Sequence, residues 1–239
     1  AGYRHIDTAR IYGNEEDVGR AVAESGIPRS EIYITTKIWN DDQGYESTMR
    51  ACEKSLQRLG MDYVDLYLVH WPVPEMRGET WRALVELQKR GQAKSIGVST
   101  YMIKHLEELL PAADVVPAVN QVEISPFIQR KELAAYCHDK GIVVESYSTL
   151  GRGQRVNDER LAAIGEAHGK TPAQVALRWA LQSDMVIIPK SVRKERIFEN
   201  AAIFDFELAE AEMKQIAGFD ENASVTPPSW DPETSDKWK

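Results

Sequence analysis

Cysteine and long apolar runs are both scarce in this chain. The 239 residues contain two cysteines, Cys52 and Cys137, each in a segment with helical spacing. Two thiols do not make the disulfide framework of a small secreted domain, so a reducing compartment is expected. No apolar run approaches the roughly 18 residues that a membrane span needs, and no basic start precedes an apolar signal core. The sequence therefore predicts a cytoplasmic protein that does not enter a membrane.

Positive charge is also in short supply. Lys and Arg number 29 against 37 Asp and Glu, which gives a formal net charge of −8. This balance argues against attraction to nucleic acid or to an acidic membrane surface, so a small-molecule partner is expected. Metal-ligand spacing is missing as well, and no metal site is expected. The five histidines lie on different segments: His5, His70, His105, His138 and His168.

The glycine pattern of doubly wound nucleotide-binding sheets, G-x-G-x-x-G, is missing too. The nearest match, GRG at 151–153, fails at the third glycine. Short β-branched runs nevertheless alternate with helical patterns along the whole chain, as in YITTKIW before TMRACEKSLQRLG and DLYLVHW before ETWRALVELQKRG. Most of these helical patterns stop at a glycine that can cap a helix, at Gly60, Gly91, Gly141 and Gly169. This alternation predicts a parallel sheet with crossover helices.

Counting the strand that ends near Asp7, the chain carries seven βα units. With 43% hydrophobic residues it can bury a sizeable core, so residues 1–239 are expected to form one domain with a C-terminal tail from about 220. The sequence predicts a (β/α)8 TIM barrel that lacks one unit, because a complete barrel needs about 250 residues. The missing N-terminal hairpin and first βα unit are expected to lie before Ala1.

Polar side chains gather where the strands are expected to end, which in a barrel is the face that carries function. These strand exits carry Asp7 with Tyr12, Lys37 with Trp39, His70 with Trp71, Ser99 with Thr100, Asn120 with Gln121, Tyr147, and Lys190 with Ser191. In the first exit, Arg10 and Glu15 are interpreted as surface or helix-start charges.

Four of these residues suit one chemistry, a general acid aimed at a carbonyl. The Lys37 ammonium favours the phenolate form of Tyr12, which makes this tyrosine a better proton donor. A buried ammonium needs a carboxylate partner, and Asp7 is the expected one. His70, as a neutral donor, would hold the carbonyl oxygen. Each residue alone has a structural alternative, from a loop aromatic to a core histidine, but the four together favour catalysis.

The ordered motifs resemble one family. From residue 1 to about 220 the chain carries GYRHIDTARIYGNE, ITTKIWN, LYLVHWP, SIGVST, VNQVE, ESYSTLG and IPKSVRKERIFEN, which are similar to the motifs of the aldo-keto reductases. The resemblance is strongest to the bacterial branch that includes 2,5-diketogluconate reductases. It implies a (β/α)8 barrel that binds NADPH and reduces aldehydes or ketones to alcohols, with many monomers among its members.

The resemblance also implies residue roles. Tyr12 matches the proton donor, Asp7 and Lys37 its ion pair, and His70 the carbonyl-orienting histidine. The cofactor-binding matches are Ser99, Thr100 and Gln121 at the nicotinamide carboxamide, Tyr147 stacked on the nicotinamide, Lys190, Ser191 and Arg196 at the 2′-phosphate, and Glu199 and Asn200 at the adenine. Trp39 and Trp71 match substrate-binding aromatics, and Gly151 and Gly153 fall in the loop over the pyrophosphate. Packing, a solvated helix face or a plain turn remain the structural alternatives for these positions.

The chain departs from the family pattern at three places. Thr100 stands where Asn usually follows Ser99, Thr149 stands where Pro is usual, and the connection VPEMRGETW after HWP is short. The sequence thus predicts an NADPH-dependent carbonyl reductase, with a small polar or dicarbonyl compound as the substrate. Two alternatives stay open: a non-catalytic NADPH-binding partner protein on the same scaffold, and an inactive N-terminally truncated fragment.

Overall fold

The computed structural model describes residues 1–155 and 157–238. Its contacts divide the chain into two compact units. The larger unit comprises Arg4–Asn120, Tyr136–Ile142 and Pro228–Lys239, and the smaller unit comprises Ala1–Tyr3, Gln121–Ala135 and Val143–Pro227. Each unit is described by itself below. The expectation of one domain over residues 1–239 stays a prediction.

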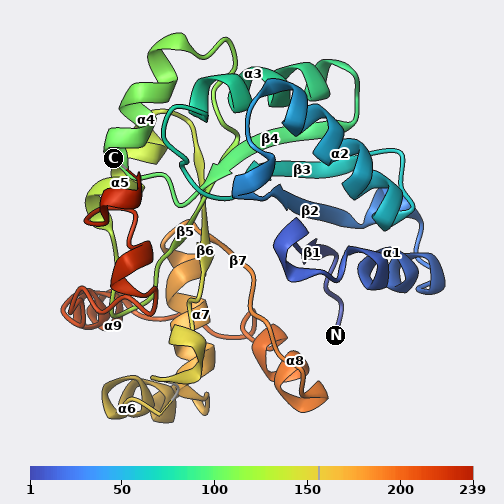
Figure 1. Cartoon of the computed structure of the whole chain (residues 1–239). Coiled ribbons are helices and arrows are strands. Elements are labelled where there is room, and N and C mark those ends of the chain that lie inside the picture. Colours follow the sequence, from blue (N-terminus) through green and yellow to red (C-terminus); the bar gives the residue numbers. More distant parts are fainter. Residues whose placement is uncertain (156, 239) are drawn as a thin grey trace. The chain divides into compact units, whose positions relative to one another are not determined.

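Strands and helices alternate in the larger unit, as the sequence predicted (Figure 1). In chain order the elements are β1 (His5–Asp7), α1 (Glu15–Glu24), β2 (Tyr33–Ile38), α2 (Tyr45–Leu59), β3 (Val64–Val69), α3 (Arg77–Lys89), β4 (Ala93–Ser99) and α4 (Ile103–Leu109). Among the described residues, seven strands form one sheet in the order β1 to β7, which agrees with the predicted α/β fold. The eighth unit, expected before Ala1, stays a prediction.

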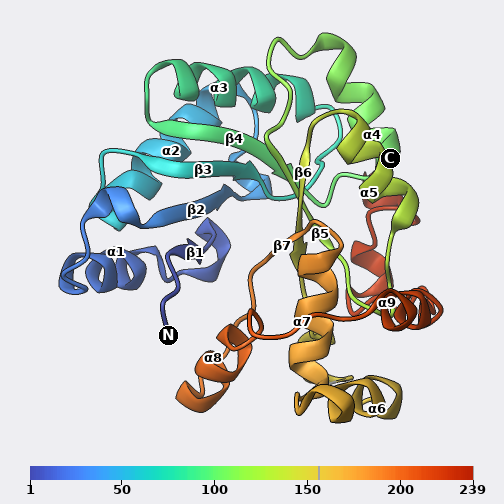
Figure 2. The same cartoon turned by 180° about the vertical axis from the view of Figure 1, so that it is seen from behind.

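The strands of the larger unit pair in parallel. Thr35 of β2 lies opposite Asp7 on one side and Leu66 on the other, and Val98 of β4 lies opposite Val69. All six residues of β3 are buried, so both faces of this strand are covered. Figure 2 shows α2 and α3 side by side against β2, β3 and β4, and apolar residues of α2 at helical spacing, such as Cys52 and Leu56, are buried there.

Glycines end the helices where the sequence predicted. Gly60 after α2 and Gly169 after α6 have φ of 64° and 62°, the left-handed conformation that glycine adopts without a steric penalty. A different constraint acts at Gly19 in α1, where an added Cβ would lie 2.2 Å from the Leu59 carbonyl oxygen. Only glycine therefore lets α1 approach the end of α2 this closely.

Helices dominate the smaller unit. Its elements are β6 (Val143–Tyr147), α6 (Glu159–His168), α7 (Pro172–Gln182), β7 (Val186–Ile187), α8 (Lys194–Ala201) and α9 (Glu210–Ala217). β7 pairs in parallel with β6. The sequence reading missed α9, although acidic residues in its first turn, Lys214 in its last and Gly218 just beyond it are ordinary helix signals.

One predicted strand exit is wrong. Asn120 and Gln121 lie inside β5 (Val119–Glu123), which precedes α5 (Lys131–Asp139), and the residue at the end of β5 is Glu123. The side chain of Glu123 is buried and accepts hydrogen bonds from the hydroxyls of Ser224 and Thr226 at 2.7 and 2.6 Å. A carboxylate is unusual at a buried strand position, and the partners of Glu123 lie about a hundred residues away in the chain, so no local pattern predicts it.

None of the helices in residues 1–155 and 157–238 has the length and apolar character that a membrane crossing requires.

Candidate active site

A buried ion pair joins the ends of the first two strands. Lys37 in β2 is fully buried, and its Nζ donates to Asp7 Oδ1 at the end of β1 over 2.5 Å. The same ammonium donates to the Thr8 carbonyl at 2.9 Å. Burying an ammonium is costly unless it is paired and hydrogen-bonded, and both conditions hold here. The predicted Asp7–Lys37 pair is thus present in the structure.

Tyr12 lies near the ammonium of this pair, on a short 3-10 turn. The turn Arg10–Tyr12 follows β1 and ends at Gly13, whose φ of 68° lets the chain reverse into α1. Lys37 Nζ lies 5.3 Å from the centre of the Tyr12 ring, and the side chain of Tyr12 is about half exposed. A phenol that faces solvent on one side and a fixed ammonium on the other is placed to exchange a proton with a bound molecule.

His70 follows β3 directly and is buried beside Tyr12. The two rings meet edge to face, with centroids 5.8 Å apart. Burial, and then the charge of Lys37, hold the pKa of His70 well below its usual value, so its imidazole is neutral. Among the described residues its Nδ1 has no hydrogen-bond partner. The neutral ring keeps one N–H that can be donated to a carbonyl oxygen.

Tryptophans surround His70. Trp39 meets the His70 ring edge-on at 5.4 Å, and Trp71 stacks on it at 6.4 Å. A third indole, that of Trp230, stacks on Trp39 at 6.0 Å. The sequence predicted Trp39 and Trp71 as substrate-binding aromatics. The resemblance to the family implied that the tail around Trp230 and Trp238 lines the pocket, but it assigned no chemistry to either tryptophan.

Glu15 corrects one interpretation made from the sequence. It does begin helix α1, but it is not a surface charge, since only 1% of the residue is exposed. Thr36 Oγ1 donates to it at 2.6 Å, and Arg58 of α2 pairs with it at 2.6 Å. Through these partners, the buried carboxylate of Glu15 connects α1 with β2 and α2. Arg10 is exposed, as expected.

Ser99 ends β4 in the larger unit, and Thr100 follows it directly. Their hydroxyl oxygens lie 3.2 Å apart, and Thr100 Oγ1 donates to the His70 carbonyl at 3.3 Å. Thr100 has φ of 64°, in the left-handed region that a β-branched residue enters only under strain. Asn tolerates this region well, which gives a physical reason for the Asn usually found after Ser99 in the resembled family.

Gln121 and Tyr147, also expected to bind the nicotinamide, belong to the smaller unit. Gln121 Nε2 donates to Glu145 Oε1 at 2.6 Å, and both residues are buried. Tyr147 ends β6 and is half-buried. The carboxamide-binding residues expected from the sequence are therefore divided between the two units.

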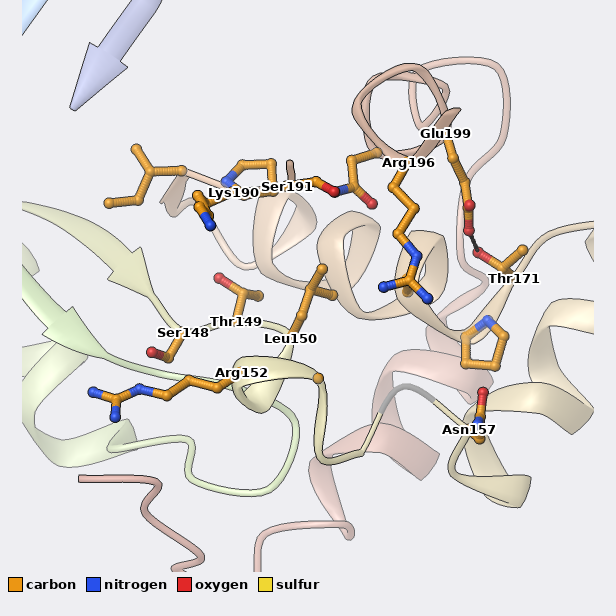
Figure 3. A pocket seen from close by; sticks show the side chains of 16 residues that line it. Ser148, Thr149, Leu150, Arg152, Asn157, Thr171, Lys190, Ser191, Arg196 and Glu199 are labelled. Carbon is orange, nitrogen blue, oxygen red and sulfur yellow. Dashed lines mark hydrogen bonds between the residues drawn. The ribbon is translucent and has the colours of Figure 1, made fainter. Parts of the chain in front are cut away.

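A cavity of about 630 Å³ lies in the smaller unit, and the remaining predicted cofactor-binding residues line it. Lys190, Ser191, Arg196, Glu199 and Asn200 all line it. Figure 3 shows the Arg196 side chain extending into this cavity from α8, opposite the loop after β6. Two cations and a hydroxyl on one wall suit a phosphate dianion.

Several further lining residues had no binding role predicted from the sequence. The loop after β6 contributes Ser148, Thr149 and Arg152, and the start of α7 contributes Thr171 (Figure 3). Gly151 and Gly153 flank Arg152 in a 3-10 turn, and Gly153 also lines the cavity. Thr171 Oγ1 donates to Glu199 Oε1 at 2.7 Å, so the carboxylate of Glu199 already has a protein donor.

Metal-ligand geometry is not found in the part of the chain that the structure describes. No three His, Cys, Asp or Glu side chains of residues 1–155 and 157–238 gather as metal ligands would. Both cysteines are buried and free, Cys52 in α2 and Cys137 in α5.

Comparison with known proteins places this site in a family. The model of the Aldo/keto reductase family matches residues 1–221. Glyoxal reductase of Bacillus subtilis is 52% identical over 226 residues, which cover 95% of this chain and 82% of that protein. The fold and the matches agree, and the chain belongs to the aldo/keto reductase family of oxidoreductases.

Solved structures agree with this assignment. A structure described as a putative 2,5-diketo-D-gluconic acid reductase B superposes with a TM-score of 0.93 at 38% identity, covering 97% of this chain and 84% of that one. An aldo-keto reductase of Bombyx mori in complex with NADP superposes with a TM-score of 0.91 at 35% identity, covering 99% and 84%. The family resemblance noted from the motifs is thereby confirmed.

Proposed function

We propose that this protein is an NADPH-dependent reductase of aldehydes or ketones in which Tyr12 donates the proton. The observation that carries the proposal is the buried Lys37–Asp7 pair, whose ammonium lies 5.3 Å from the centre of the Tyr12 ring beside the neutral His70. Structural neighbours in complex with NADP or NADPH support the cofactor.

The residues of the smaller unit fit this cofactor. Lys190 and Arg196 line the same cavity with the Ser191 hydroxyl, and these donors suit the 2′-phosphate that distinguishes NADPH from NADH. Asn200, which is buried, and Glu199 would hold the adenine. Ser99, Thr100, Gln121 and Tyr147 are proposed to hold the nicotinamide, which when bound supplies hydride to the carbonyl carbon.

The protein's own groups would handle the carbonyl oxygen. His70, being neutral, can donate its N–H to that oxygen without adding a second cation next to Lys37. The Tyr12 hydroxyl then gives its proton to the oxygen, and the Lys37 ammonium stabilises the phenolate that remains. Asp7 keeps Lys37 charged and in place. Trp39 and Trp71 would exclude water from one side of the substrate.

The substrate class proposed is a small polar or dicarbonyl compound. The B. subtilis relative is named a glyoxal reductase, which supports a compact dicarbonyl. The non-catalytic partner alternative has no observation in its favour, because similar proteins of Bacillus subtilis are named a glyoxal reductase and an oxidoreductase.

Substitution of the proton donor tests the mechanism. Tyr12→Phe should lower kcat for methylglyoxal by about 10²- to 10⁴-fold, the range for general acid catalysis. The dissociation constant for NADPH, measured by fluorescence titration, should stay unchanged, because Tyr12 is not among the residues proposed to hold the cofactor. Tyr45→Phe, which removes a hydroxyl at the start of α2, is the matched control and should retain full turnover.

Two results would contradict the proposal. Wild-type turnover by Tyr12→Phe would show that another group donates the proton. NADPH binding by the wild-type chain without turnover of any aldehyde or dicarbonyl would instead favour the partner-protein alternative, and the absence of both would favour the inactive fragment.

A further inference from the structure

A backbone carbonyl in the C-terminal tail accepts hydrogen bonds from two buried side chains of the larger unit. Arg77 Nη2, at the start of α3, donates to the Trp238 carbonyl at 2.7 Å, and His105 Nε2 of α4 lies 3.1 Å from the same oxygen. The exposed fractions of Arg77 and His105 are 5% and 1%. We call these two side chains, with the carbonyl they hold, the Trp238 socket.

The proton on His105 is placed by its other nitrogen. The Met102 N–H donates to His105 Nδ1 at 3.0 Å, so Nδ1 must be the acceptor. The single proton of the neutral ring therefore sits on Nε2 and is donated to Trp238. Burial, and then the charge of Arg77, lower the pKa of His105 to about 4 and keep this neutral form at physiological pH.

Arg77 also connects the tail to the loop that carries His70. Its Nε donates to the Pro72 carbonyl at 3.0 Å, and its Nη1 pairs with Glu108. Pro72 lies two residues after His70. A single guanidinium thus joins the loop after β3, helix α4 and the tail, with a donor directed at each.

In the C-terminal tail, the side chain of Trp238 links the socket to the aromatic residues around His70. The Trp238 indole stacks on Trp71 at 5.0 Å, and its Nε1 donates to the Trp230 carbonyl at 3.2 Å. Trp230 in turn stacks on Trp39, whose ring meets His70. Outside the socket, Lys104 Nζ donates to the Glu233 carbonyl at 2.9 Å. The position of Trp230 thus depends on how residues 228–238 are held.

We propose that the Trp238 socket fixes Trp230 against Trp39 beside His70 and thereby makes the enzyme select compact carbonyl substrates. Arg77 and His105 touch no reacting group in this account, so they are positioning residues. The inference rests on the proposed function, because it concerns the substrate of the same site. With the socket intact, Trp230 covers a small carbonyl compound; with the socket broken, larger compounds gain relative to small ones.

The test compares socket variants with a control on the same helix. Arg77→Met and His105→Leu remove donors to Trp238, whereas Arg82→Met removes an exposed arginine of α3 that pairs with Glu79. KM and kcat would be measured for methylglyoxal and for 2-naphthaldehyde, and amide hydrogen exchange would be followed over residues 228–238. The NADPH dissociation constant would be measured on each variant.

Both socket variants should raise the KM for methylglyoxal about tenfold, the effect of losing about 1.4 kcal/mol of binding, with kcat within about threefold. The ratio of kcat/KM for 2-naphthaldehyde to that for methylglyoxal should rise about tenfold. Exchange over 228–238 should accelerate, and NADPH binding should not change. His105→Gln, which keeps an N–H donor, should restore much of the selectivity, and Arg82→Met should resemble the wild type.

Unchanged exchange in 228–238, or faster exchange with an unchanged selectivity ratio, would overturn the inference. If Arg77→Met does not fold, the comparison of His105→Leu with His105→Gln gives the same decision. Failure of the proposed function would show in the wild-type chain as an absence of turnover, so it is distinguishable from failure of the socket.

Discussion

The cations at the candidate site differ between the two units in burial and in pairing. In the larger unit the ammonium of Lys37 is fully buried and already paired with Asp7 at 2.5 Å. In the smaller unit Lys190 and Arg196 are exposed along the cavity wall, and among the described residues neither pairs with a carboxylate. The first charge has its counterion inside the protein, whereas the other two face an open site.

This difference matches two kinds of task. A buried, paired ammonium is preorganised, so it can stabilise a developing phenolate without rearrangement during the reaction. Exposed cations lose little on folding and gain when an external anion binds between them. Damage to the first arrangement should therefore reduce both stability and turnover, and damage to the second should reduce cofactor binding alone.

Removing the buried ammonium should have the largest effect. Lys37→Met leaves the Asp7 carboxylate without its partner, which should lower the free energy of unfolding by about 3–5 kcal/mol. It also removes the charge facing Tyr12, so kcat should fall about 10³-fold. Urea unfolding and steady-state kinetics measure the two effects. The double variant Asp7→Asn/Lys37→Met should regain part of the stability and none of the activity; a fully active Lys37→Met would refute this account of the pair.

A decrease in pH should destabilise the larger unit. The histidines with lowered pKa values, His5, His70 and His105, all belong to it. His105 titrates near 6.5 in the unfolded chain and at about 4 in the folded protein, so between these values the unfolded chain binds a proton that the folded protein excludes. Stability should therefore fall as pH decreases from about 6.5 to 4, by about 3 kcal/mol for His105.

Urea unfolding at a series of pH values measures this loss. The slope should be smaller in His105→Gln, which does not titrate in this range. An equal slope in both proteins would show that the proton uptake occurs elsewhere.

Arg196→Ala should affect the cofactor cavity without affecting stability. Loss of one charge-assisted contact to a phosphate, worth about 1.5–3 kcal/mol, should raise the NADPH dissociation constant about 10- to 100-fold. NADH binding should barely change, because NADH lacks the 2′-phosphate. The control is Lys194→Ala, an exposed cation of α8 outside the cavity lining. Equal losses for NADPH and NADH would remove Arg196 from the phosphate site.

The smallest expected effect is a gain at Thr100. Asn is more stable than Thr at φ near 64°, so Thr100→Asn should raise the free energy of unfolding by about 1 kcal/mol. The melting temperature measures this change. Ser95→Asn, on the same strand but outside the left-handed region, is a control that should show no gain. A less stable Thr100→Asn would mean that the hydrogen bond from the threonine hydroxyl to His70 outweighs the strain.

Much of the fold follows from local sequence patterns. Helices α2, α3 and α4 and strands β2, β3 and β4 overlap the segments predicted as helical or β-branched, with ends that differ by up to three residues. The Asp7–Lys37 pair could also be foreseen, because each residue stands at the end of a strand and parallel strands end together. Helix α9 and the interior position of Gln121 were missed.

The partners of several buried charges could not be predicted from the sequence, because they lie far away in the chain. Glu15, Glu123 and Arg77 are buried charges whose partners are up to 161 residues away in the chain. Periodicity reports only which side of an element is apolar, and it contains no information on which distant donor satisfies a buried charge.

The sequence by itself determined the alternation of strands and helices and the types of residue at the strand ends, because both are local properties of the chain. The tertiary structure decided that Glu15 is buried, that Glu123 ends β5, and that Trp230 reaches Trp39 through the Trp238 socket. Each of these depends on where the chain returns in space, and that position is set by packing.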